Sequence, residues 1–205
     1  IEVIVEKNRL ISNQSWTLIT KHQHKFTFDS KEFKKGFNQL KKAKSDFKSL
    51  PKDKQNKILK KHAYSLQNLN SPIQLSYVYM AKYKEAIPVL EEMLIHIDEN
   101  EKLKDAQKIY PINSLTGIHA TLGNLNQVIY YLGLYNNLAA NLVHSKDGVA
   151  YVSFTIPYQA FVIYNLGLFE EAKKLVQFND DNILRKRDTT VDILQNDILG
   201  LTAGN

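Results

Sequence analysis

The sequence predicts an all-α fold built from antiparallel helical hairpins, and two observations carry this prediction. Apolar residues recur at intervals of three and four over residues 33–47, which is the period of one buried helix face. Further along, one pattern of large, small and aromatic residues occurs three times. The 205 residues, 43% hydrophobic and 23% charged, match the composition of globular domains and are enough to bury a core.

The first third of the chain predicts helices from about residue 29 onward. Residues 1–28 are left open, because IEVIVE and the apolar cluster at 16–19 suit either a strand or a helix. Asp29 with Glu32 three residues later predicts a helix start. The apolar stripe of this helix is Phe33, Phe37, Leu40, Ala43 and Phe47.

A second helix is predicted after Pro51, since proline ends one helix and is tolerated in the first turn of the next. Its apolar stripe runs from Ile58 to Leu66. We therefore expect a lysine-rich helical hairpin over residues 29–68. The segment Asn70-Ser71-Pro72 predicts a further helix start.

The threefold pattern places a large residue four positions before a small turn residue. An aromatic or leucine follows two positions after the turn, a small or β-branched residue three positions later, and Leu or Val four after that. A small turn residue lets one helix end and the next begin at a steep angle, and glycine accepts positive φ there. The three copies are Tyr77-x-x-x-Ala81-x-Tyr83-x-x-Ala86-x-x-x-Leu90, His119-x-x-x-Gly123-x-Leu125-x-x-Val128-x-x-x-Leu132 and Ile163-x-x-x-Gly167-x-Phe169-x-x-Ala172-x-x-x-Val176.

This pattern resembles the tetratricopeptide repeat, in a long variant with turn residues 42 and 44 positions apart. The resemblance implies a right-handed superhelix (solenoid) of antiparallel hairpins, with three repeats over residues 69–180. The usual first-helix tryptophan is missing, and Pro111 and Pro157 lie where first helices should run, so we expect those helices to be bent or split. Residues 181–205 are expected to form a C-terminal helix or cap.

In the resembled family the first helix of each pair tends to line a concave groove. That position implies a binding surface of amide, aromatic and small apolar side chains, which suits an extended peptide. The groove residues expected are Ser71, Leu75, Val78, Tyr79, Asn113, Thr121, Phe161, Tyr164 and Asn165.

The resemblance implies a non-catalytic domain that binds a peptide or protein, as the sensing or regulatory part of a bacterial signalling or transcription-control protein. A structural adaptor or assembly module is the alternative, and a homodimer is left open. No apolar run is long enough to span a membrane. The chain starts at Ile1, so we expect a mature chain or a fragment, and its compartment is open between the bacterial cytoplasm and an extracytoplasmic sensor domain.

Charge is distributed unevenly, with a balance of +10 over residues 1–63 and −4 over residues 64–205. Such a basic stretch can attract polyanions, although lysine on a solvated helix face is the simpler interpretation. Arg9 is the only arginine in this third, which argues against specific nucleic-acid readout. The candidate basic patch is Lys34, Lys35, Lys41, Lys42, Lys60 and Lys61.

Signals for catalysis are thin. Cysteine is absent, which excludes disulfides, thiolate metal sites and a cysteine nucleophile. The sequence holds no HExxH, P-loop, GxGxxG or GxSxG motif. His22 and His24 lack an evident third metal ligand, and the acid pair Glu91-Glu92 suits a solvated helix face. We therefore expect no enzyme activity, no cofactor and no metal.

Overall fold

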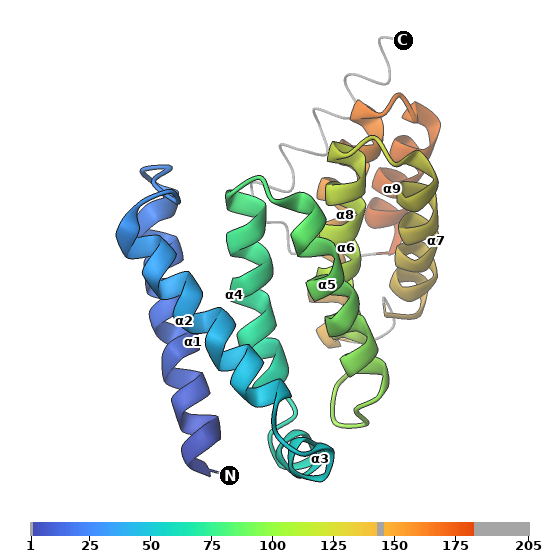
Figure 1. Ribbon diagram of the computed structural model, residues 1–205. Coiled ribbons are helices and arrows are strands. Elements are labelled where there is room, and N and C mark those ends of the chain that lie inside the picture. Colours follow the sequence, from blue (N-terminus) through green and yellow to red (C-terminus); the bar gives the residue numbers. More distant parts are fainter. Residues whose placement is uncertain (1, 143–145, 183–205) are drawn as a thin grey trace. The chain divides into compact units, whose positions relative to one another are not determined.

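The computed structural model describes residues 2–142 and 146–182, and within these ranges it consists of helices and turns without a strand (Figure 1). The chain divides into two compact units, which are described separately. The N-terminal unit, Ile1–Lys104, holds α1 (Glu2–Gln23), α2 (Lys31–Lys48), α3 (Lys52–Lys61), α4 (Ser65–Tyr79) and α5 (Tyr83–Asp98). The C-terminal unit, Asp105–Asn205, holds the 3₁₀ helix η1 (Asp105–Lys108), α6 (Ile109–Thr121), α7 (Leu125–Leu142), α8 (Lys146–Asn165) and α9 (Phe169–Asn182). The all-α prediction is confirmed.

The three predicted turns have the same helix-ending geometry. Ala81, Gly123 and Gly167 all adopt the left-handed conformation, with φ of 55°, 72° and 80°. In each turn the next residue donates its N–H to the carbonyl of the large residue that opens the pattern, the 6→1 bond of a Schellman motif. These bonds are Lys82 to Tyr77 (2.8 Å), Asn124 to His119 (2.9 Å) and Leu168 to Ile163 (3.1 Å).

The small positions of the pattern lie where the paired helices pack together. Ala86, Val128 and Ala172 are fully buried, and α4 packs on α5, α6 on α7, and α8 on α9. A larger side chain at these positions would separate the two helices of a hairpin. The offsets of the pattern therefore describe three equivalent hairpins.

A fourth hairpin, α1–α2, ends its first helix in the same way. Phe26 has φ of 51°, the Phe26 N–H donates to Gln23 (3.4 Å) and the Thr27 N–H donates to His22 (3.3 Å). The segment left open over residues 1–28 is therefore the long helix α1 and its Schellman turn. The connection between α1 and α2, residues 24–30, is four residues longer than the other three turns, so the spaced pattern does not reveal it.

The helix α2 begins one residue later than the Asp29–Glu32 pair predicted. Ser30 is the N-cap, and its hydroxyl accepts a hydrogen bond from the Phe33 N–H at 3.2 Å. The predicted stripe from Phe33 to Phe47 is buried throughout. It forms the centre of the core of the N-terminal unit.

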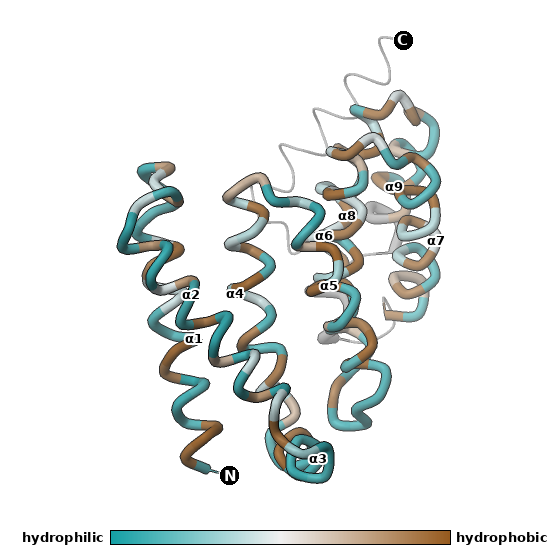
Figure 2. Tube along the Cα trace, in the orientation of Figure 1, coloured by the Kyte–Doolittle hydropathy of each residue, from teal (hydrophilic) through white to brown (hydrophobic). Residues whose placement is uncertain are grey.

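The predicted boundary at residue 68 falls inside α4, because the second apolar stripe is divided between α3 and α4. The packing partners of α2 are α1 and α4. Outside its buried Gln55 and Ile58, α3 is a hydrophilic surface helix (Figure 2). It is inserted between the α1–α2 and α4–α5 hairpins.

The sequence predicted a helix start at Pro72. That prediction is wrong, because Pro72 lies in the middle of α4. Proline has no N–H to donate to the carbonyl four residues earlier, Asn68. The hydroxyl of Ser12 on α1 donates to that carbonyl at 2.5 Å. The contact between α1 and α4 thus satisfies the group that proline leaves without a partner.

Glu92 on α5 ties three helices of the N-terminal unit together. Its carboxylate binds the Lys44 ammonium at 2.5 Å and the Lys48 ammonium, both on α2, and accepts a hydrogen bond from Asn70 on α4 at 3.2 Å. Burial alone would raise the pKa of Glu92, but the hydrogen bonds from Lys44 and Lys48 outweigh it and hold the pKa below 4.5. The solvated face expected for Glu91-Glu92 is therefore wrong for Glu92.

In the C-terminal unit α8 packs on both α6 and α7. The sequence predicted that the first helices are bent or split at their prolines, but neither helix is split. Pro111 lies in the first turn of α6, where no intrahelical donor is needed, and α8 continues across Pro157. The helix α9 continues to Asn182, two residues beyond the predicted repeat boundary at residue 180. The C-terminal helix expected beyond it lies outside the described residues.

Candidate functional site

The helices α6 and α8, the first helices of two successive hairpins, approach closely at Gly117. A Cβ at this position would lie 2.7 Å from the hydroxyl of Tyr158 on α8. Only glycine fits without moving the tyrosine. Gly117 therefore sets how near the Tyr158 ring lies to the backbone of α6.

A buried polar pair lies in the same seam. Gln159 is fully buried and donates from Nε2 to the Thr116 hydroxyl at 3.2 Å, while Thr116 donates to the carbonyl of Ile112 at 2.9 Å. Among the described residues, Gln159 Oε1 and the buried Oδ1 of Asn113 have no hydrogen-bond partner. Gln159 is fully buried, whereas Asn113 is only half-buried, so a small rotation of the Asn113 side chain would bring its amide oxygen within reach of a donor from a bound molecule.

The same two helices carry exposed aromatic rings. Tyr158 and Phe161, one helical turn apart on α8, are 45% and 46% exposed, and Tyr110 near the start of α6 is 40% exposed. Rings of this kind give rigid contact area at a small cost in conformational entropy. We name the set Tyr110, Asn113, Gly117, Tyr158 and Phe161 the α6–α8 face.

Of the groove residues predicted in this unit, Asn113 and Phe161 belong to the α6–α8 face. Thr121 and Asn165 are exposed but use their donors within their own helices, on the carbonyls of Gly117 (2.9 Å) and Phe161 (2.7 Å). Tyr164 is half-buried, and its ring packs against Phe169 across the hairpin turn, with ring centres 5.0 Å apart. These three side chains therefore make their contacts within their own hairpins.

The groove residues predicted in the N-terminal unit lie on α4 and are half-buried. Leu75 and Tyr79 pack against the core cluster of α1, α2 and α4. The Tyr79 ring stacks on Phe28, with ring centres 4.8 Å apart and planes 8° from parallel. Ser71 and Val78 are partly exposed beside them.

All six residues of the predicted basic patch are exposed, on α2 and at the end of α3. Lys42 is paired with Asp46 at 2.8 Å, Lys61 is paired with Glu2, and the Lys41 ammonium lies 4.9 Å from the centre of the Phe37 ring. Ion pairs therefore neutralise part of the patch.

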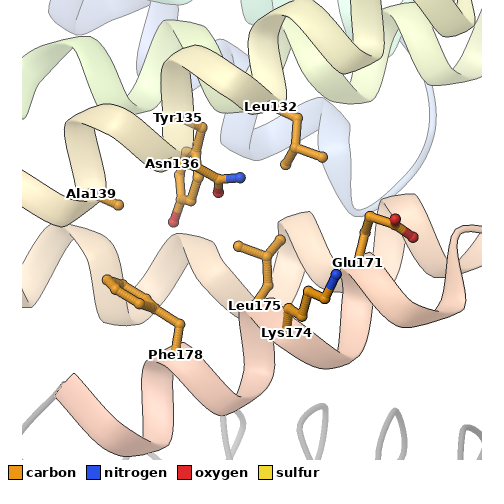
Figure 3. A pocket seen from close by; sticks show the side chains of 8 residues that line it. All are labelled: Leu132, Tyr135, Asn136, Ala139, Glu171, Lys174, Leu175 and Phe178. Carbon is orange, nitrogen blue, oxygen red and sulfur yellow. The ribbon is translucent and has the colours of Figure 1, made fainter.

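A pocket of about 280 Å³ between α7 and α9 was not anticipated from the sequence (Figure 3). Its walls are the apolar stripes Leu132, Tyr135 and Ala139 on α7 and Leu175 and Phe178 on α9, with Asn136, Glu171 and Lys174 at the polar edge. The spacing of Leu132, Tyr135 and Ala139 along one helix face is the signal that could have indicated it.

Tyr135 anchors the floor of this pocket. It is fully buried and its hydroxyl lies 2.6 Å from the hydroxyl of Thr155 on α8. Burial raises the pKa of Tyr135 well above its ordinary value, and the hydrogen bond to Thr155 lowers it only in part. The side chain therefore stays neutral and supports packing and no proton transfer near neutral pH.

His22 and His24 are not brought together. His22 is buried, its Nδ1 lies 2.6 Å from the Thr27 hydroxyl and its Nε2 lies 3.6 Å from Glu32, whereas His24 is exposed. Over residues 2–142 and 146–182, no three His, Asp or Glu side chains are placed to hold a metal ion. In the same ranges no helix combines the length and the apolar character needed to cross a bilayer.

Comparison with known proteins finds no matching family model, no similar curated protein and no similar solved structure. The function must therefore be inferred from the residues themselves.

Proposed function

We propose that the chain is a non-catalytic repeat domain of the tetratricopeptide kind that binds an extended peptide segment of a protein partner on the α6–α8 face. The observation that carries the proposal is the juxtaposition on this face of two half-exposed rings, Tyr158 and Phe161, with the unpartnered amide oxygen of Asn113. A peptide offers the matching groups, a backbone N–H for the amide and apolar side chains for the rings.

The proposal includes a superhelical stack of hairpins. Within each unit the first helix of one hairpin packs on the first helix of the next, α1 on α4 and α6 on α8. The second helix of the earlier hairpin also packs on the next first helix, α2 on α4 and α7 on α8. This nearest-neighbour packing is what a repeat array requires. The sensing or regulatory role in a bacterial protein rests on the family resemblance.

The test is selection of peptides from a random display library against the full chain, followed by affinity measurement for the strongest peptide. We expect Phe161→Ala and Asn113→Ala to weaken binding tenfold or more, about 1.4 kcal/mol each. Ile129→Ala is the matched control, because Ile129 is 54% exposed but lies on α7. Equal affinity of Phe161→Ala and the unchanged chain would overturn the proposal.

A second candidate function, an assembly module, is favoured by the outer surface of α7. Leu125, Ile129 and Tyr130 are 46%, 54% and 57% exposed on this one helix, and an exposed apolar patch is typical of a protein interface. A second copy of the chain is the first partner to test. Concentration-dependent dimers in sedimentation velocity that Ile129→Glu abolishes would support assembly, and a monomer at all concentrations would exclude the homodimer.

A further inference from the structure

A second pocket, of about 490 Å³, lies in the N-terminal unit where α1 passes the connection between α3 and α4. Its lining includes Arg9 from α1, Lys61 and His62 from the end of α3, Ser65 from the start of α4, and Lys102 from the segment after α5. Four basic side chains from three separate segments thus converge on one cavity. None of the residues that line this cavity belongs to the predicted groove or to the α6–α8 face.

The carboxylates around this pocket do not fully neutralise it. Glu6 binds the Arg9 guanidinium through both oxygens, at 2.9 and 2.7 Å, and Glu2 binds the Lys61 ammonium and lies 3.4 Å from His62. Lys102 has no ion-pair partner among the described residues. Both carboxylates are more than half exposed, so an incoming anion can displace them at little cost.

The N-terminus of the 15-residue helix α4 lies beside the same pocket, which Tyr64 and Ser65 line. Its N-cap, Tyr64, makes no side-chain cap hydrogen bond, and the N–H groups of Leu66 and Gln67 have no backbone acceptor among the described residues. Free N–H groups and the helix dipole both favour a negative charge at this end.

Ser65 gives the second, independent observation. It is 6% exposed and lines the pocket, yet its hydroxyl has no hydrogen-bond partner among the described residues. A buried hydroxyl without a hydrogen-bond partner costs free energy, and a ligand that hydrogen-bonds to it would remove this cost. The side chain therefore adds a donor to the cations and the helix end.

We propose that this pocket binds a phosphate group, with Arg9, Lys61 and Lys102 supplying charge and Ser65 and the first N–H groups of α4 supplying hydrogen bonds. Once Glu2 and Glu6 are displaced, three permanent cations remain around the pocket, which suits the dianion of a phosphate. The cavity is larger than a phosphate ion, so the group can belong to a small phosphorylated molecule.

The test is a ¹H–¹⁵N NMR titration of the full chain with inorganic phosphate, against sodium chloride at equal ionic strength. We expect saturable shifts of the Ser65, Leu66 and Gln67 amides with phosphate and none with chloride. Non-saturable shifts spread over the lysines of α2 and α3 would overturn the proposal, because they indicate only screening.

Variants locate the site. Lys102→Gln should weaken phosphate binding about three- to tenfold, and Ser65→Ala should weaken it as well. Lys57→Gln is the matched control, since it removes the same charge from an exposed position on α3 outside the pocket. Equal affinities of Lys102→Gln and Lys57→Gln would refute the assignment.

Two further titrations separate the ligand classes. Phosphoserine binding more tightly than inorganic phosphate would support a phosphorylated small molecule, and equal or weaker binding would refute that part of the proposal. Acetate producing the same saturable shifts at the same concentrations would identify a carboxylate site and overturn the phosphate proposal.

Discussion

Replacing glycine by alanine should change the stability of the protein in opposite directions in the hairpin turns and inside a helix. Gly123 and Gly167 have positive φ, and a Cβ at either position would meet no heavy atom within 4 Å. The cost of alanine there is therefore purely a backbone cost. Gly133, inside α7, also has open space around it but has no positive φ.

The change in the free energy of unfolding for glycine to alanine in a turn is the sum of two opposing effects. The left-handed conformation costs an alanine roughly 1–2 kcal/mol. Alanine also lowers the conformational entropy of the unfolded chain, which stabilises the folded state by about 0.4–1 kcal/mol. We therefore expect Gly123→Ala to lower the free energy of unfolding by about 0.5–1 kcal/mol. Gly133→Ala should raise it by a similar amount, since alanine is the better helix former by about 1 kcal/mol.

Ala81 allows the reverse experiment. Its φ of 55° places an alanine where the other two copies have glycine, so Ala81→Gly should stabilise the N-terminal unit. The net gain is again about 0.5–1 kcal/mol, after the entropy that glycine adds to the unfolded chain.

The assay is thermal and urea unfolding of the full chain followed by circular dichroism at 222 nm. A change of 1 kcal/mol corresponds to roughly 2–4 °C in Tm for a chain of this size. Gly123→Ala and Gly133→Ala should shift Tm in opposite directions. If both shift it the same way, the conformational argument is wrong.

Three further expectations concern the buried polar contacts. Glu92→Gln should destabilise the chain at pH 7 by about 1–2 kcal/mol in urea unfolding, because Lys44 keeps its largely buried ammonium and loses its carboxylate. The pKa of Glu92 is lowered in the folded state, so the stabilisation by its ion pairs is present above pH 4.5 and is lost as the pH falls through the folded-state pKa. The stability difference between the unchanged chain and Glu92→Gln should therefore shrink in acid. A difference that does not depend on pH would contradict the pairing. Tyr135→Phe should cost about 1 kcal/mol by removing the hydrogen bond to Thr155, and an unchanged urea midpoint would show that this bond contributes nothing.

The hairpins could be predicted from the sequence because their signals are local. A left-handed residue, a helix-ending carbonyl five positions before its donor, and a small residue three positions into the next helix all lie within one short segment. These features need no knowledge of distant residues. The same holds for the aromatic stripe of α2, whose period is a property of the helix alone.

The candidate binding residues were only partly predictable. The resemblance placed Asn113 and Phe161 on neighbouring first helices. It could not show that Thr121 and Asn165 bind their own helices, or that Tyr164 packs on Phe169. Those outcomes depend on side-chain geometry at the helix ends. The lining of the second pocket, at the start of α4, includes residues as far apart in the sequence as Arg9 and Lys102, so only the fold could reveal it.

The helix α1 shows most clearly what the sequence determined and what tertiary structure decided. Its buried face has the helical period, but it consists largely of polar side chains, Asn8, Ser12, Ser15, Ile19 and His22, so apolar periodicity does not reveal it. Ser12 of the same face satisfies the carbonyl that Pro72 frees and lets α4 continue through a residue that locally signals a helix start. Local chemistry determined where the hairpins turn, because those bonds close within a few residues. The tertiary structure decided which polar groups could be buried, because their partners come from elsewhere in the chain.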